Sequence, residues 1–328
     1  MLSLSGCYVS KQAYYQGKLI FSRQKIDEVL KSDKLTPQEK RKLELSKVVL
    51  AFAEKNGLKS EGSYSTFVHT NEPVVSYLVY ASPKDKLELK KWWFPIVGSV
   101  PYLGFFHKED RDEEAAKLEK QDLDVFQAGA SAFSLLGWFS DPIYSPMLRH
   151  KDNDFAHLLF HELTHKTFWA PDKAQFNENL AEFVALTLMQ QYVKENSNAT
   201  DYKLYLEGRA DDELFKAWLK ELKSELQKLY AEKIDIDQMM KKKSEIFESF
   251  LSTAKLPKFK TRDYAGTLKK PWNNARVLAT SIYSPELEPF EKAFHCLREP
   301  QIGAFLERLK SAIKATGNGQ EALQELCK

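Results

Sequence analysis

Cysteine is scarce in this chain of 328 residues, which contains only Cys7, Cys296 and Cys327. Three cysteines are too few for a disulfide framework, and without a Cys-x-x-Cys pair they argue against a cysteine-based zinc or redox site. No apolar run is long enough for a transmembrane helix. An excess of one charge is also lacking, because 48 basic and 46 acidic residues give a net charge of +2, which argues against a dedicated nucleic-acid-binding protein.

Glycine is infrequent as well, at 13 residues, which favours a helix-rich chain over a turn-rich all-β one. Residues 8–57 have helical apolar spacing, with Thr36-Pro37 as a predicted helix start. Residues 202–255 have the pattern of an amphipathic helix that begins a helical hairpin. Between these regions, β-branched and aromatic runs predict short strands within residues 62–139. We therefore expect an α+β fold that is mainly helical and has a small β-sheet.

The strongest chemical signal is the segment His161-Glu162-Leu163-Thr164-His165. Acidic Asp152 and Asp154 precede it and favour a helix start, so the segment is predicted to be helical. Positions four apart lie on one face of a helix, so both imidazoles can bind the same metal ion. Glu162 lies beside them, where it can take a proton from a water on the metal, as in the zinc-peptidase motif. The alternative is two histidines on an ordinary amphipathic helix.

A catalytic zinc ion needs a third protein ligand and an open position for water. Asn177 stands twelve residues after His165 and is predicted to cap a second helix and to support the site. Glu178 then becomes the predicted third ligand, if this helix packs antiparallel on the first. Glu182, one turn later, is predicted to accept a hydrogen bond from the free nitrogen of a ligating histidine, or else to be a solvated carboxylate. His157 is expected to be a partly exposed histidine near the helix start.

Together, these two motifs resemble those of the gluzincin metallopeptidases. The spacing between them is shorter than in thermolysin-like or aminopeptidase N enzymes, and it is similar to that of a family of bacterial proteins described as predicted aminopeptidases. This resemblance covers nearly the whole chain, and the segments that carry it are Gly6-Cys7-Tyr8, Trp93 to Gly98, Tyr102 to Phe106, Ser134 to Pro142, Phe160 to His165, Phe176 to Glu178 and Asn273 to Arg276. The chain departs from the family at Phe94, where cysteine is usual, and at Lys166, where glutamine is common.

For the fold, the resemblance implies a zincin-like metallopeptidase with a small β-sheet before the helix of the His-Glu-x-x-His motif. The expected organisation is an N-terminal helical segment 1–60, a catalytic core 61–200 and a C-terminal helical region 201–328 that closes the cleft. One compact domain is the alternative to three separate parts.

For the chemistry, the resemblance implies one Zn²⁺ ion per chain, held by His161, His165 and Glu178. Glu162 would act as the general base in hydrolysis of peptide bonds by metal-activated water, and the family name implies an aminopeptidase. No residue identifies a site for the free α-amine, so a zinc endopeptidase stays open as an alternative. A non-catalytic scaffold of the cell envelope that binds zinc or a partner is the second alternative.

Substrate-binding residues are also implied. Similar peptidases bind the peptide backbone along an edge strand upstream of the metal helix, and the segment in that position contains Ser131, Ala132, Phe133 and Ser134. The alternative is an ordinary buried strand. Tyr264 and Tyr283 are candidate donors to the tetrahedral intermediate, or core aromatics with satisfied hydroxyls. Arg276 is a candidate ligand for a substrate carboxylate, or a member of a structural ion pair.

The N-terminal segment Leu4-Ser5-Gly6-Cys7 has the form of a bacterial lipoprotein cleavage site, and members of the family often carry such a signal. We therefore expect peptide substrates, no nucleic-acid partner and membrane anchoring through a lipidated Cys7, which places the protein in the cell envelope or periplasm. If the motif is fortuitous, Cys7 is inert and the expected location is the cytoplasm.

Overall fold

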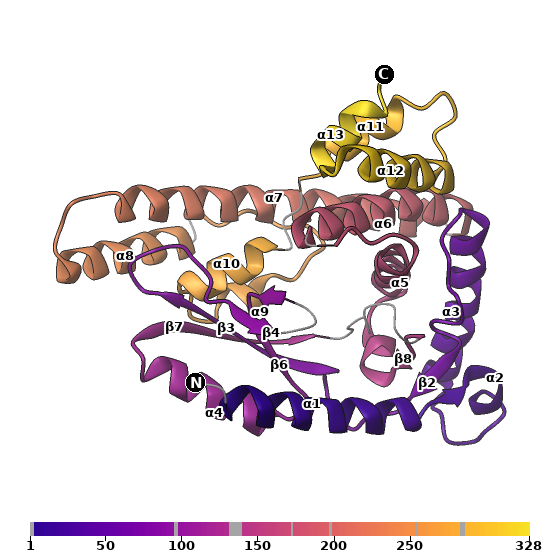
Figure 1. Ribbon diagram of the computed structural model, residues 1–328, viewed down its shortest axis with the longest axis horizontal. Coiled ribbons are helices and arrows are strands. Elements are labelled where there is room, and N and C mark those ends of the chain that lie inside the picture. Colours follow the sequence, from indigo (N-terminus) through magenta and orange to yellow (C-terminus); the bar gives the residue numbers. More distant parts are fainter. Residues whose placement is uncertain are drawn as a thin grey trace. The chain divides into compact units, whose positions relative to one another are not determined.

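The structure is a computed structural model that describes residues 3–94, 98–130, 140–171, 173–196, 199–252, 255–282 and 286–328. Helices dominate it, and the described strands form two three-stranded sheets and one two-stranded sheet (Figure 1). The predicted mainly helical α+β class is therefore confirmed. In the described part of the chain, no helix combines the length and the apolar character that a membrane span requires.

The chain divides into two compact units, each built from segments that are far apart in the sequence. Unit 1 comprises Met1–Ser76, Ala130–Ser197 and Pro285–Lys328, and unit 2 comprises Tyr77–Gly129 and Asn198–Ser284. The three consecutive segments expected from the sequence follow a different division, and they stay a prediction.

The N-terminal part of unit 1 contains three helices, α1 (Ser3–Phe21), α2 (Ile26–Val29) and α3 (Pro37–Lys55). The predicted helix start at Thr36 is confirmed by a capping box, in which the Thr36 hydroxyl accepts from the Glu39 N–H and the Glu39 carboxylate accepts from the Thr36 N–H. After α3, Gly57 has a φ of +92° and a side chain there would meet the backbone of Gly303, so glycine is required for both reasons.

A small sheet of unit 1 leads into the helix of the His-Glu-x-x-His motif. Strand β2 (Thr66–Val68) pairs antiparallel with β1 (Gln24–Lys25) and parallel with β8 (Ile143–Tyr144). A 3₁₀ helix, η1 (Ser145–Arg149), then connects β8 to α5 (Asp152–Thr167). The prediction that the strands lie within residues 62–139 was too narrow, because β1 and β8 are two-residue strands that carry no alternating pattern.

Helix α5 is anchored at its first residue and along its apolar face. The Arg41 guanidinium forms two hydrogen bonds of 2.6 and 2.8 Å to the Asp152 carboxylate, and Lys42 adds an ion pair, which together lower the pKa of Asp152 to about 2. Phe155 and Phe160 are fully buried on α5, and the Phe160 ring packs 5.7 Å from Phe52 of α3. The residues that anchor α5 are therefore different from its candidate metal ligands, His161 and His165.

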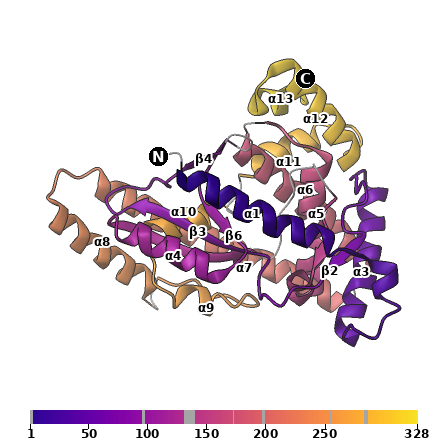
Figure 2. The ribbon, with the colours of Figure 1, turned by 60° about the horizontal axis from the view of Figure 1, so that its bottom comes forward.

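The C-terminal helices of unit 1 pack on α6 (Ala174–Asn196). They are α11 (Glu288–His295), α12 (Ile302–Thr316) and α13 (Gly319–Glu325), and Figure 2 shows α12 and α13 side by side near the C-terminus. The contact with α6 is aromatic, since the Phe183 ring lies 5.6 to 6.0 Å from the rings of Phe290, Phe294 and Phe305. Burial of these rings supplies a large apolar contribution to the stability of unit 1.

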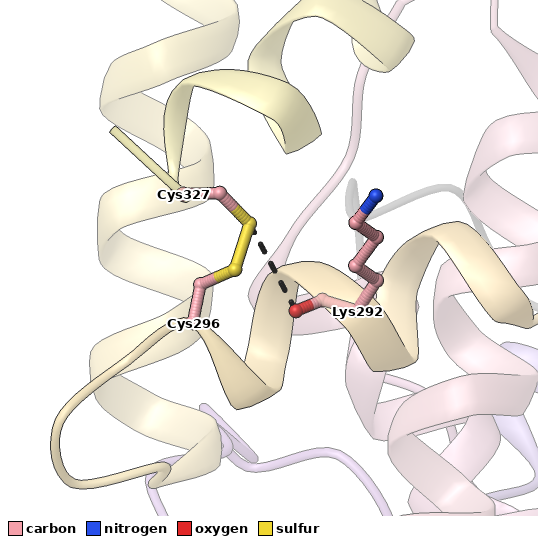
Figure 3. The surroundings of a disulfide bond; sticks show 3 residues. All are labelled: Lys292, Cys296 and Cys327. Carbon is pink, nitrogen blue, oxygen red and sulfur yellow. Dashed lines mark hydrogen bonds between the residues drawn. A yellow bond between two sulfur atoms is a disulfide. The ribbon is translucent and has the colours of Figure 1, made fainter.

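One disulfide, between Cys296 and Cys327, joins the end of α11 to the end of the chain (Figure 3). Two cysteines 31 residues apart in sequence close a loop whose entropy loss in the unfolded chain stabilises the fold by roughly 3–4 kcal/mol. The Cys327 sulfur also lies 3.9 Å from the carbonyl oxygen of Lys292, a packing contact, because a disulfide sulfur has no proton to donate. The sequence spacing gave no sign of this pairing.

Unit 2 contains the other two sheets and a short helix. Strand β3 (Ser76–Pro83) lies between β6 (Leu103–Phe105), with which it pairs antiparallel, and β7 (Leu123–Ala130). The remaining elements of this part are β4 (Trp92–Phe94), β5 (Gly98–Val100) and α4 (Lys108–Glu119).

The helical part of unit 2 is a hairpin of α7 (Ala199–Tyr230) and α8 (Ile236–Leu251), as Figure 1 shows, and the predicted hairpin is thus confirmed. Its core includes Trp218 and Leu222 of α7 and Phe250 of α8. Two further helices, α9 (Ala265–Leu268) and α10 (Asn274–Ile282), follow it, and Val277 of α10 and the preceding Trp272 join the same core.

Candidate metal centre

Helices α5 and α6 of unit 1 bring three predicted ligands together. The Nε2 atoms of His161 and His165 lie 3.2 Å apart. One carboxylate oxygen of Glu178 lies 3.4 Å from the His161 Nε2 atom, and the other lies 3.5 Å from the His165 Nε2 atom. Two helix positions one turn apart thus face a carboxylate that comes from the neighbouring helix.

These separations can be compared with those that a metal ion requires. Zn²⁺ binds nitrogen and oxygen at about 2.0–2.1 Å in tetrahedral geometry, so its ligand atoms lie about 3.3–3.4 Å from one another. The two imidazole nitrogens are 3.2 Å apart, and the Glu178 oxygen nearest to each of them lies at 3.4 or 3.5 Å, so all three separations are close to this range. The donor set of two imidazoles and one carboxylate also suits zinc. The residues present therefore fit a zinc ion with one position left for solvent.

The protonation of the cluster follows from burial and from its carboxylates. Burial, and then the charge of His161, lower the pKa of His165 to about 4. For His161 burial acts in the same direction, but hydrogen bonds to Glu178 and Glu182 outweigh it and raise the pKa to about 10. Burial of Glu178 opposes ionisation, yet its contacts with His161 and His165 keep its pKa below the usual value. A single cation, proton or metal, is therefore favoured between these groups.

Glu182 and His157 form a second group that shares His161. The Glu182 carboxylate accepts a hydrogen bond of 2.9 Å from the His157 Nε2 atom, and the same oxygen lies 3.7 Å from the His161 Nδ1 atom. These residues also meet the geometric requirement for a metal site. The 2.9 Å contact is a hydrogen-bond distance, however, and the oxygen faces the nitrogen of His161 that points away from Glu178. Glu182 is thus positioned to orient His161.

The sequence reading of His157 was incomplete. The residue is partly exposed, as expected, but it is also the hydrogen-bond partner of Glu182. Its place one turn before His161 on the same helix face was the only signal in the sequence. For Glu182, whose ionisation burial opposes, the charge of His157 and the hydrogen bonds to both histidines hold the pKa well below its usual range.

Asn177 does not cap α6, contrary to the prediction, because the helix begins three residues earlier, at Ala174. Its side chain instead bonds to both backbone groups of Ala170: Oδ1 accepts from the N–H at 2.9 Å and Nδ2 donates to the carbonyl at 2.8 Å. Asn177 is 1% exposed, so this pair of bonds is shielded from water. The contact fixes the connection between α5 and α6, and with it the position of the next residue, Glu178.

Glu162 follows His161 directly on α5. The charged groups that shift its pKa are His161, Glu178 and Asp141. Burial, opposed by His161 and reinforced by the two carboxylates, raises the pKa of Glu162 to about 7. Within the described ranges, no residue forms a hydrogen bond or an ion pair with its carboxylate. A carboxylate whose pKa is near neutral and whose oxygens are not engaged is suited to general acid–base work.

The predicted substrate and oxyanion residues either lie outside the described residues or belong to unit 2. Ser131, Ala132, Phe133, Ser134 and Tyr283 lie outside the described residues. Tyr264 belongs to unit 2, where its ring stacks on Phe215 at 4.4 Å and its hydroxyl donates to Asp212 at 2.5 Å. These contacts favour the alternative of a core aromatic with a satisfied hydroxyl.

The segment Asn273 to Arg276 also belongs to unit 2. The Arg276 guanidinium donates to the backbone carbonyls of Lys270, Pro271 and Thr267, and its carbon lies 4.4 Å from the Trp272 ring centroid. The residue is 3% exposed. Its partners are carbonyls and aromatic rings, so the contacts favour a structural role, although not through the ion pair that the sequence suggested.

Two further residues of unit 1 lie beside the centre and carried no motif in the sequence. Tyr64 is 3% exposed and interacts electrostatically with Glu162. Trp169 is 47% exposed, and its ring lies 5.6 Å from the ring of His165. Tertiary contacts bring Tyr64 and Trp169 to the centre, so no sequence pattern could have identified them as neighbours of the predicted ligands.

The fold and the site together define a mainly helical α+β protein with a partly buried histidine–glutamate cluster that can hold a metal ion. Residues 7–323 match the sequence profile of the family described as "Putative aminopeptidase", so the chain belongs to that family. Membership supports a peptidase that acts on peptide substrates. No curated protein and no solved structure matches the chain, and the zincin-like fold therefore stays a prediction.

The different protonation of the two histidines is directly testable. In the metal-free protein at pH 8, His161 is expected to be a charged imidazolium, because its pKa is raised to about 10, and His165 is expected to be neutral, because its pKa is lowered to about 4. Zinc binding requires neutral imidazoles and should remove the His161 proton. Histidine ¹⁵N chemical shifts measure both states, with His161→Gln and His165→Gln for assignment. Two neutral rings at pH 8 before zinc is added would contradict this account.

Proposed function

We propose that this chain is a zinc-dependent peptidase, with one zinc ion per chain held by His161, His165 and Glu178. The observation that carries the proposal is a pair of imidazole nitrogens 3.2 Å apart, each with a Glu178 carboxylate oxygen within 3.5 Å, next to a partly buried carboxylate, Glu162, of raised pKa. Membership in a family of aminopeptidases supports peptide bonds as the substrate.

A zinc ion bound there would supply Lewis acidity and lower the pKa of a bound water to about 7. Glu162 would accept the proton of the attacking water at its carboxylate. Since its pKa is about 7, the same group could then donate that proton to the leaving amine. Glu182, held by His157, would keep the Nδ1 atom of His161 protonated and its Nε2 atom available to the ion.

Glu162→Gln is expected to lower kcat for peptide hydrolysis at least 100-fold, because it removes the proton acceptor and keeps the shape of the side chain. Zinc content should not change, since Glu162 is not one of the proposed ligands. The measurements are peptide-library hydrolysis and elemental analysis, with Glu195→Gln on the exposed end of α6 as the control. Equal hydrolysis by wild type and Glu162→Gln would remove the general-base role, and native protein without zinc would favour a non-catalytic scaffold.

The aminopeptidase assignment rests on the family name, and a zinc endopeptidase is the alternative. An aminopeptidase must bind the free α-amine of its substrate, so N-acetylation of a peptide should reduce kcat/KM by at least about 100-fold, equivalent to roughly 3 kcal/mol of binding in the transition state. Matched free and N-acetylated peptides, with products identified by mass spectrometry, measure this ratio. Equal cleavage of both, at internal bonds, would identify an endopeptidase.

We also propose a location in the cell envelope, with Cys7 as a lipid anchor. The Cys296–Cys327 disulfide supports an oxidising compartment, because such bonds are rare in the reducing cytoplasm. The pairing uses two of the three cysteines, and Cys7 is the third.

Protein expressed in a bacterium with its native N-terminal region is expected to incorporate radiolabelled palmitate at Cys7. The Cys7→Ser variant should not be labelled, while the double variant Cys296→Ser/Cys327→Ser should keep the label. Unlabelled wild-type protein, or a label that survives in Cys7→Ser, would refute the anchor.

A further inference from the structure

A short segment of unit 1, residues 59–65, runs along the last turns of α5. The Lys59 N–H donates to the Thr167 hydroxyl at 2.8 Å, and the Glu61 carboxylate forms an ion pair of 3.4 Å with Lys166. Lys166 and Glu162 are one turn apart on α5, so they share a helix face. The segment therefore passes beside the face that carries Glu162.

Tyr64 is held in this segment by an unusual backbone. Its φ is +62°, in the left-handed region that bulky residues rarely adopt, and Glu61 and Gly62 also have positive φ values. Two hydrogen bonds maintain the conformation: the Tyr64 N–H donates to the Asp141 carbonyl at 2.5 Å, and the Asp141 N–H donates to the Ser63 hydroxyl at 3.1 Å. Strained residues that the surrounding structure holds in place are concentrated at functional sites.

The surroundings of Tyr64 make it a hydrogen-bond donor without an acceptor. The residue is 3% exposed. Burial, with the nearby carboxylates of Glu162 and Asp141, raises the pKa of Tyr64 well above its usual value, so the phenol stays protonated. In the described part of the chain, no group hydrogen-bonds to its hydroxyl. Among the described residues, the Tyr64 hydroxyl is not one of the side-chain atoms that are both fully enclosed and unpaired, so a group that is not part of the protein can reach it and act as the acceptor.

We propose that Tyr64 is a catalytic residue of this centre, whose hydroxyl donates a hydrogen bond to the carbonyl oxygen of the scissile peptide bond. That oxygen gains negative charge when water attacks the carbonyl carbon, and a fixed neutral donor in a buried site stabilises the charge. Glu162 takes the proton of the water. The electrostatic interaction between Tyr64 and Glu162 without a hydrogen bond leaves the donor available for the substrate. The inference rests on the proposed peptidase function.

The test compares wild type, Tyr64→Phe and Tyr192→Phe. Tyr192 is a suitable control because it is also a buried tyrosine of unit 1, but its ring packs on Phe52 and Phe160. Tyr64→Phe should lower kcat 10²- to 10³-fold, with KM within about threefold of wild type, because the bond forms mainly in the transition state. Tyr192→Phe should retain wild-type kcat.

Two further measurements separate this role from a structural one. The melting temperature of the metal-free protein and the zinc content should be unchanged in Tyr64→Phe, since no bond within the protein is lost. A peptide phosphinate, whose tetrahedral oxygens resemble those of the transition state, should bind Tyr64→Phe about 100-fold more weakly. A fall in melting temperature or zinc content that accounts for the lost activity would overturn the proposal.

The outcomes for Tyr64 and for the peptidase function are distinguishable. If wild type hydrolyses peptides and Tyr64→Phe does so at the same kcat, the role of Tyr64 is wrong and the peptidase function is retained. If wild type hydrolyses no peptide in the library while it holds zinc, both proposals fail together.

Discussion

The antiparallel packing of α5 on α6 is the constraint on which the centre depends. Helix α5 buries Phe155 and Phe160 on one side, and this orients His161 and His165, one turn apart, toward α6. The opposing carboxylate of Glu178 is then set within 3.5 Å of both imidazoles. Three polar groups held this closely in a partly buried place would destabilise the fold unless a cation lies between them, because they are only partly solvated there. The packing that stabilises unit 1 therefore also creates a site that selects a cation.

Two carboxylates of this centre have pKa values shifted in opposite directions, although burial raises the pKa of both. Glu182 is paired with His157 and remains ionised, whereas Glu162 has no such partner in the described structure and its pKa rises to about 7. Carboxylates whose pKa values are driven apart by their surroundings can take different roles, one as a permanent charge and the other as a proton carrier. The difference between the two pKa values comes from the contacts of Glu182 with histidine, and it is present before any substrate binds.

A segment that carries family resemblance can serve the fold instead of the chemistry, as residues 273–276 show. Asn274 donates from its side chain to the carbonyls of Pro83, Lys84 and Lys86 and accepts from the Tyr230 hydroxyl at 2.7 Å. The same hub includes the buried ion pair between Lys243 and Asp124. A motif of polar residues is thus explained within unit 2 by the need to satisfy buried carbonyl groups.

What the sequence by itself determined is local. The capping box at Thr36, the hairpin of α7 and α8 and the spacing of His161 and His165 follow from residues within a few turns of one another, and the choice of Glu178 required only one short connection. Only the tertiary structure decided the partner of His157, the bonds of Asn177 to Ala170, the pairing of Cys296 with Cys327 and the approach of Tyr64 to Glu162. The reason is that helix propensity and capping act between neighbours, whereas these contacts arise when packing brings distant or differently oriented segments together.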